Sequence, residues 1–219
     1  MAHIHDHRTT GASTSHVVTA GDNDTRRELA ELTRMFNVSS EEFLGEVRRL
    51  SMRQYAYFNA TMHRVKDANC PQIFDFLTGG AGVGKSVVIR VLQSAVTRWF
   101  NTIPHNDRDK AKVMVAAFTN RAAANVNGIT LYAMGSLVVN QQIGLANEHK
   151  DLNEVTVARL RNLYSDVNML VIDEVSMVSN DLFAQLHCRM RQIFDNNLPY
   201  DGLHMVAVGD LFQLKPTSG

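Results

Sequence analysis

A glycine-rich stretch, TGGAGVGKS at Thr78–Ser86, has the residue types and spacing of a loop that binds phosphate groups. Its glycines let backbone N–H groups turn inward around phosphate oxygens, and a helix that starts here offers its N-terminus to negative charge. Lys85 would reach the outer phosphates of a nucleotide, and the hydroxyl of Ser86 would bind Mg²⁺. The residues expected to contact the nucleotide are Gly79, Gly80, Ala81, Gly82, Val83, Gly84, Lys85 and Ser86.

The same residues could form only a glycine-rich turn with an exposed lysine. However, an apolar stretch typical of a strand precedes them and a helical pattern follows, which is the context that phosphate binding requires. We therefore expect ATP with Mg²⁺ as the ligand.

Two neighbouring carboxylates end a second apolar stretch, MLVIDEVSM. Asp173 and Glu174 would emerge at the carboxyl end of a strand, which is where ligands bind in open α/β sheets. We expect Asp173 to hold Mg²⁺ through water and Glu174 to polarise the attacking water. Such a pair can also simply cap the next helix, but the phosphate-binding pattern upstream favours the catalytic interpretation.

A third apolar stretch, in VAVGDLFQLKP, is followed by Asp210 and Gln213. If this strand joins the same sheet, both side chains emerge at the same edge as Glu174. A neutral amide there can contact the γ-phosphate and a water molecule. A surface glutamine in a loop before Pro216 is the alternative, and the spacing leaves both open.

These residues need a scaffold of alternating strands and helices. Apolar strands are predicted at 72–78, 112–118, 168–174 and 203–210, with helices at 84–100, 120–126, 155–164 and 180–194 between them, and 127–153 as an irregular stretch. Continuous apolar strands separated by helices indicate a mainly parallel sheet covered on both faces, a three-layer α/β fold. Residues 1–23 are predicted to be a flexible tail and 24–49 a helical segment, with a helix start at Ser39 and Ser40.

Bulk composition excludes several classes of protein. The 219 residues carry 22 basic and 22 acidic side chains, so the net charge of zero argues against a broad basic face, although not against a narrow nucleic-acid groove. No apolar run approaches the about 18–20 residues that span a bilayer, so we expect no membrane association. Cys70 and Cys188 lie far apart, with neither metal-binding spacing nor a disulfide framework.

Three stretches, FLTGGAGVGKS, LVIDEVSMV and AVGDLFQLKP, resemble in this order the motifs of the Pif family of superfamily 1 DNA helicases, especially the helicase segments of Helitron transposons. The resemblance implies a RecA-like ATPase domain over 50–219 that uses ATP and Mg²⁺ to move 5′→3′ along single-stranded DNA. It also implies that Gln213 couples the γ-phosphate to DNA. In RLSMRQ it implies that the amide of Gln54 faces the adenine base, the alternative being an ordinary exposed glutamine.

The segment AAFTNRAAANVNGITLYAMGS resembles the DNA-facing motif of the family, with departures. Phe118, Asn120 and Tyr132 replace a proline, a glycine and a histidine of the family pattern. The altered turn puts the backbone contacts to DNA in doubt, and Tyr132 could equally be a core aromatic. The residues expected to contact DNA are Thr119, Arg121, Thr130 and Tyr132.

The family resemblance further implies a second RecA-like motor domain with an arginine finger, which we expect downstream of residue 219. The chain alone would then bind Mg·ATP, hydrolyse it slowly and unwind no duplex. The expected pathways are DNA repair, recombination, telomere maintenance or transposition, in the nucleus or alternatively in mitochondria. A small-molecule kinase and a non-catalytic nucleotide-binding remnant are the rival interpretations, which ATP turnover with and without single-stranded DNA would separate.

Overall fold

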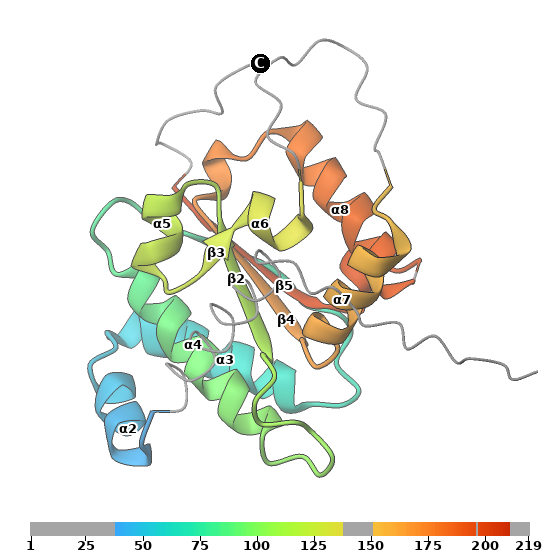
Figure 1. Ribbon diagram of the computed structural model, residues 1–219. Coiled ribbons are helices and arrows are strands. Elements are labelled where there is room, and N and C mark those ends of the chain that lie inside the picture. The colour runs from blue at the N-terminus through green and yellow to red at the C-terminus, as the bar shows by residue number, and fades with distance from the viewer. Residues whose placement is uncertain (1–37, 138–150, 196, 211–219) are drawn as a thin grey trace, which may run out of the picture.

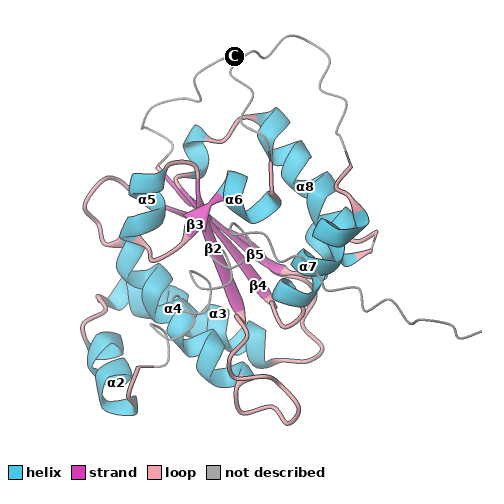
Figure 2. Ribbon diagram, viewed as in Figure 1, coloured by secondary structure: helices cyan, strands magenta, loops and turns pink. Residues whose placement is uncertain are grey.

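The computed structural model describes residues 38–137, 151–195 and 197–210, which form a five-stranded sheet with helices on both faces (Figures 1 and 2). The strands lie in the order β1-β5-β4-β2-β3, and every neighbouring pair is parallel. The predicted three-layer α/β fold is therefore confirmed. The strands are β1 Phe74–Thr78, β2 Val113–Ala117, β3 Ile129–Thr130, β4 Met169–Asp173 and β5 His204–Gly209.

Burial along each strand follows its place in the sheet. All five residues of β2 and of β4 are buried, as expected for central strands covered on both faces. Strand β1 lies at the edge, and its residues alternate between exposed and half-buried. Phe74 and Phe76 of β1 are 54% and 45% exposed because they lie on the face of β1 that none of the described helices covers.

Seven α-helices lie in the described part of the chain, and six of them start at a side chain that accepts a backbone N–H. Ser39 is such a cap, as the sequence predicts. Helix α4 differs, because its N-cap is Gly84 and no side chain caps it. The helices are α2 Ser40–Arg48, α3 Met52–Lys66, α4 Lys85–Phe100, α5 Asn120–Asn125, α6 Leu131–Gly135, α7 Glu154–Tyr164 and α8 Asn180–Phe194.

The sheet separates two hydrophobic cores, and alternate residues of β4 enter each. Leu170 and Ile172 pack in the core under α6, α7 and α8, whereas Met169 and Val171 pack in the core under α3 and α4. Figure 1 shows these two groups of helices on opposite sides of the sheet. Within the described segments, no helix combines the length and the hydrophobicity that crossing a membrane requires.

The predicted irregular stretch at 127–153 is wrong at its start, because β3 and α6 lie there. Strand β3 has only two residues, which is too short to show a period, and its second residue, Thr130, is already the N-cap of α6. Strand β5 is consequently the fifth strand rather than the fourth. The tail 1–23 and the helical segment as far as residue 37 lie outside the described residues.

A buried ion pair lies at the amino ends of strands β2 and β4, whereas the glycine-rich loop lies at the carboxyl ends of the strands. Lys112, just before β2, is fully buried, and its Nζ donates to the carboxylate of Asp166 at 2.5 Å and to the carbonyl of Asp107 at 2.6 Å. Burial by itself raises the pKa of Asp166, but the hydrogen bonds from Lys112 and Ser165 outweigh it and leave this pKa below its ordinary value. The folded chain therefore favours the charged form of Asp166.

We predict that Asp166→Ala lowers the free energy of unfolding by about 3–5 kcal/mol, because it leaves the ammonium of Lys112 buried without its counter-charge. Urea denaturation measures this loss. Asp109→Ala, at an exposed acid nearby, is the matched control and should change stability by less than about 0.5 kcal/mol. Equal effects of the two substitutions would contradict the role of the pair.

The loss of stability caused by Asp166→Ala should depend on pH. Asp166 has an ordinary pKa of 3.8 and a lower one in the folded chain, so the unfolded chain takes up the proton first as the pH falls. The stabilisation is complete above the ordinary pKa and is lost as the pH falls through the folded pKa. The difference in stability between the natural chain and Asp166→Ala should therefore shrink below about pH 4.

Candidate nucleotide-binding site

The carboxyl ends of β1, β5, β4 and β2 meet at one edge of the sheet. Thr78 pairs with Gly209, and Ala117 pairs with Asp173, so the segments that follow these residues leave the sheet together. Apart from Gln54 in α3, the predicted nucleotide residues lie at or after the ends of β1, β4 and β5, and the predicted DNA residues lie at or after the ends of β2 and β3. Parallel pairing thus gathers two groups of residues that lie far apart in the sequence.

The glycine-rich loop joins β1 to α4, as the sequence predicts. Gly82 and Gly84 have φ values of 75° and 82°, a left-handed conformation that glycine adopts without steric cost. Nζ of Lys85 donates to the carbonyls of Gly79 at 2.5 Å and Gly80 at 2.9 Å, so the ammonium lies over the loop. Helix α4 has no side-chain cap, so N–H groups of its first turn are suited to bind an anion, except that of Val87, which donates to the carbonyl of Gly84 at 3.1 Å.

Asp173 is the last residue of β4, and the residue as a whole is 7% exposed. Its Oδ1 accepts the N–H of Glu174 at 2.9 Å. Burial raises the pKa of Asp173, while that hydrogen bond and the positive charge of Lys85 oppose the rise. A second cation close to this carboxylate would offset the remaining cost of its burial.

Glu174 has a left-handed backbone, with φ 52° and ψ 40°, which is uncommon for a residue other than glycine. Burial and the neighbouring Asp173 raise the pKa of Glu174, and Arg121 and Lys85 oppose the rise. The side chain of Glu174 does not cap the short 3-10 turn Val175–Met177 that follows. The alternative of a simple capping pair is therefore not supported, since Ser179 caps the next helix, α8.

Asp210 follows β5 at the same edge and is 6% exposed. Gly209, just before it, packs closely on this region, since a Cβ there would lie 3.0 Å from a methyl group of Val175. Gln213, predicted to contact the γ-phosphate, lies outside the described residues.

Gln54, in the first turn of α3, contacts the glycine-rich loop directly. Its Nε2 donates to the carbonyl of Val83 at 3.0 Å and to that of Gly84 at 3.5 Å. Its Oε1 accepts the N–H of Ser51, which closes a capping box at the start of α3. Gln54 is therefore partly buried against the loop, a contact that no spacing or periodicity in the sequence indicates, and its contact with adenine stays a prediction.

The four predicted DNA residues lie together around α5 and α6. Thr119 and Thr130 are the N-caps of these helices, and each hydroxyl oxygen accepts a backbone N–H at 3.1 Å. The side chain of Arg121 is exposed on α5. Tyr132 is half-buried and packs against the core. Its exposed part leaves room for a contact with DNA, and its buried part is what a core aromatic would show.

Two departures from the family pattern contact each other. The rings of Phe118 and Tyr132 lie 6.1 Å apart between centroids, in a tilted arrangement typical of aromatic pairs. The rings of Phe118 and Tyr132 therefore pack against each other. Gly128, between α5 and β3, has a packing role, because a Cβ there would lie 2.6 Å from the carbonyl oxygen of Val115.

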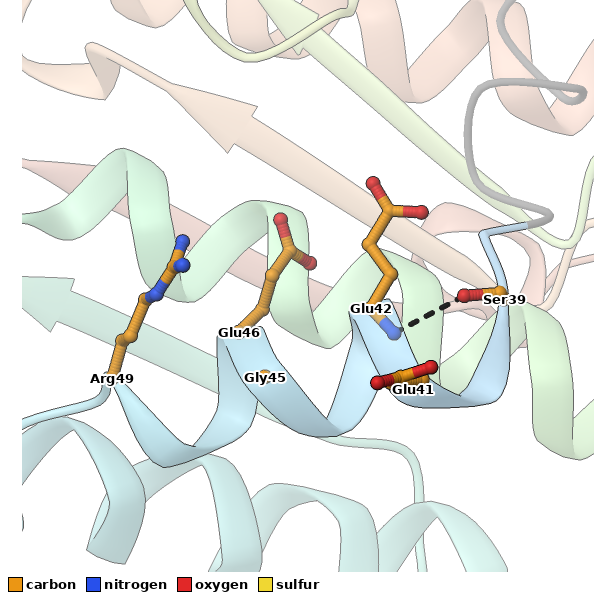
Figure 3. Close-up of a pocket in the computed structure, with 6 residues that line it drawn as sticks. All are labelled: Ser39, Glu41, Glu42, Gly45, Glu46 and Arg49. Carbon is orange, nitrogen blue, oxygen red and sulfur yellow. Dashed lines mark hydrogen bonds between the residues drawn. The ribbon is translucent and has the colours of Figure 1, made fainter.

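A separate hollow lies on α2, away from the predicted residues. Figure 3 shows the side chains of Glu42, Glu46 and Arg49 on one side of this helix, with Ser39 at its start. All lining residues belong to α2 or flank it, and three of them are glutamates. The candidate site therefore remains at the carboxyl edge of the sheet.

Known proteins resemble this chain over about two thirds to three quarters of its length. "ATP-dependent DNA helicase PIF1" of Emericella nidulans is 38% identical over 146 residues, which cover 64% of this chain and 18% of the relative. The protein of the same name from Saccharomyces cerevisiae is 32% identical over 146 residues, covering 65% and 15%. A Bacteroides Pif1 helicase, solved in complex with ADP-AlF3 and single-stranded DNA, superposes with a TM-score of 0.52 at 26% identity, covering 74% of this chain and 33% of that one.

The chain thus spans less than a fifth of the two curated relatives' length and a third of the solved chain. The family model described as PIF1-like helicase matches residues 49–219, which is most of the sequence and includes the whole carboxyl edge of the sheet. This chain belongs to the PIF1-like helicase family.

Proposed function

We propose that this chain binds Mg·ATP and hydrolyses it as one RecA-like motor domain of a DNA helicase. The observation that carries the proposal is the uncapped start of α4, which lies beside Lys85 at the strand edge that also bears Asp173 and Glu174. Backbone N–H groups and an ammonium attract phosphate oxygens, and two carboxylates beside them supply the other half of phosphoryl-transfer chemistry.

The residues present fit Mg²⁺. The hydroxyl of Ser86 and the carboxylate of Asp173 are hard oxygen ligands, and Mg²⁺ is usually held by one or two such groups together with substrate phosphates. The cost of burying Asp173 also favours a cation beside it. When bound, the ion would neutralise charge on the phosphates.

Side chains of the protein would contact the phosphates and activate the attacking water. Lys85 would leave the carbonyls of Gly79 and Gly80 for the outer phosphates, which are stronger acceptors. Glu174, whose pKa burial and Asp173 raise, would polarise the attacking water as a general base. Asp210 would contribute at the same edge, and Gln213 would sense the γ-phosphate.

We further propose that single-stranded DNA crosses α5 and α6 at Thr119, Arg121, Thr130 and Tyr132. The Bacteroides relative, solved with single-stranded DNA, supports this class of partner. A threonine that accepts a backbone N–H keeps its hydroxyl hydrogen for a phosphate oxygen. The positive charge of Arg121 also lowers the pKa of Glu174. The same cation would therefore interact with both DNA and the hydrolytic site.

The finer parts of the proposal rest on the family. They are 5′→3′ translocation, cooperation with a second RecA-like motor domain that carries an arginine finger, and a role in DNA repair, recombination, telomere maintenance or transposition. The proposed location is the nucleus, with mitochondria as the alternative.

We predict that Lys85→Ala weakens binding of Mg·ATP by at least about tenfold, because a charge-assisted contact to phosphate is lost. The fold should persist, since the ammonium contacts only loop carbonyls. Equilibrium binding of a fluorescent ATP analogue measures the affinity. Lys110→Ala is the control, because Lys110 donates to Asn162 and Ser165 away from the loop. Unchanged affinity in folded Lys85→Ala would remove the loop as the phosphate site.

The two carboxylates should give different defects. Glu174→Gln should keep Mg·ATP binding and lower hydrolysis by about 10²–10⁴-fold, as expected when a general base is removed. Asp173→Asn keeps an oxygen for the N–H of Glu174 but should weaken nucleotide affinity and its dependence on Mg²⁺ together. Binding and single-turnover hydrolysis, measured across Mg²⁺ concentrations, test this division. Identical profiles for the two variants would contradict it.

Arg121→Ala should weaken binding of single-stranded DNA and make it less dependent on salt. Loss of one phosphate contact reduces the slope of log affinity against log salt by about 0.7. Fluorescence anisotropy of a labelled oligonucleotide across salt concentrations measures the slope. Arg108→Ala, an exposed cation before β2, should leave it unchanged. The same slope for both variants would exclude this surface.

A further inference from the structure

Gln54 uses both atoms of its side-chain amide within the protein. Oε1 accepts the N–H of Ser51 at 2.8 Å, inside its own helix cap, and Nε2 donates to the carbonyl of Val83 at 3.0 Å. The two contacts tie the start of α3 to the far end of the glycine-rich loop, 29 residues away. In this arrangement the amide faces the loop backbone.

The contact with Val83 fixes the orientation of one peptide group. The carbonyl of Val83 and the N–H of Gly84 belong to the same planar trans peptide, so they point in opposite directions. While Gln54 holds the carbonyl on the α3 side, the N–H of Gly84 is directed to the other side of the loop. That N–H immediately precedes Lys85 and the uncapped first turn of α4.

The carbonyl of this peptide accepts the amide of Gln54, whereas the next carbonyl, that of Gly84, accepts the N–H groups of Val87 and Val88 at the start of α4. Gly84 can adopt many backbone conformations, and the side chain of Val83 is 54% exposed. The fit to Gln54 is close, since a Cβ on Gly84 would lie 2.5 Å from Nε2. Gly84 therefore provides both the left-handed φ of 82° and the space that the amide occupies.

We infer that Gln54 is a positioning residue: it sets the Val83–Gly84 peptide so that the N–H of Gly84 is presented to the phosphates of the nucleotide. The inference rests on the proposed nucleotide site and specifies how the site is pre-organised. It differs from recognition of adenine, because its effect on binding is independent of the base.

The test compares Mg·ATP, Mg·GTP and Mg·tripolyphosphate, whose binding is measured by calorimetry on the natural chain and two variants. Gln54→Met keeps an unbranched side chain and good helix propensity but removes the amide. Ser51→Ala removes the capping hydroxyl while the backbone N–H of Ser51 can still bond Oε1. It therefore controls for a weaker start of α3, which thermal melting reports separately.

We expect Gln54→Met to weaken all three ligands alike, by about threefold to tenfold, the range for one neutral hydrogen bond. Ser51→Ala should lower the melting temperature and leave all three affinities unchanged. A loss confined to ATP would show that Gln54 reads the base and would overturn the inference. Unchanged affinities in Gln54→Met, or equal losses in Ser51→Ala, would overturn it as well.

Failure of the proposed function looks different in the same experiment. If the natural chain binds none of the three ligands, the nucleotide site itself is wrong and the inference falls with it. If the natural chain binds and Gln54→Met binds equally well, only the positioning role is wrong.

Discussion

Parallel pairing of β1, β5 and β4 is the constraint on which the rest of the site depends. Parallel strands all end at the same edge, so the loop after β1, the carboxylates after β4 and Asp210 after β5 leave the sheet side by side. Such strands need cover on both faces, which the two groups of helices supply. Apolar β4 therefore does two things at once: it fills both cores and delivers Asp173 to the edge.

Charge at this edge is balanced rather than strongly positive. Lys85, Arg121 and the start of α4 face Asp173 and Glu174, and both carboxyl groups have raised pKa values because burial outweighs these cations. Left-handed backbone also occurs here, without steric cost at Gly82 and Gly84, and at Glu174, where it is uncommon for a residue other than glycine. A bound phosphate group would offset the positive charge of Lys85 and of the start of α4. A cation bound with it would offset the negative charge of the carboxylates.

Strand β1 is one edge of the sheet that the structure describes, and its two faces differ. Asp75 of β1 points toward α3, where Arg64 forms an ion pair with it. An inward-pointing charge on an edge strand is a common protection against pairing with another chain. On the other face of β1, Phe74 and Phe76 are largely exposed in the part of the chain that the structure describes.

Local sequence patterns by themselves determined the glycine-rich loop, the strand that ends in Asp173 and Glu174, the capped start of α2 and the three-layer class, because each depends on neighbouring residues. Only the tertiary structure decided the strand order, the two-residue β3, the pairing of Phe118 with Tyr132 and the contact of Gln54 with Val83. Lys112 and Asp166, 54 residues apart, belong to the same group. Contacts between distant residues are selected by packing of the whole chain, and no periodicity or spacing within one segment records which partners that packing brings together.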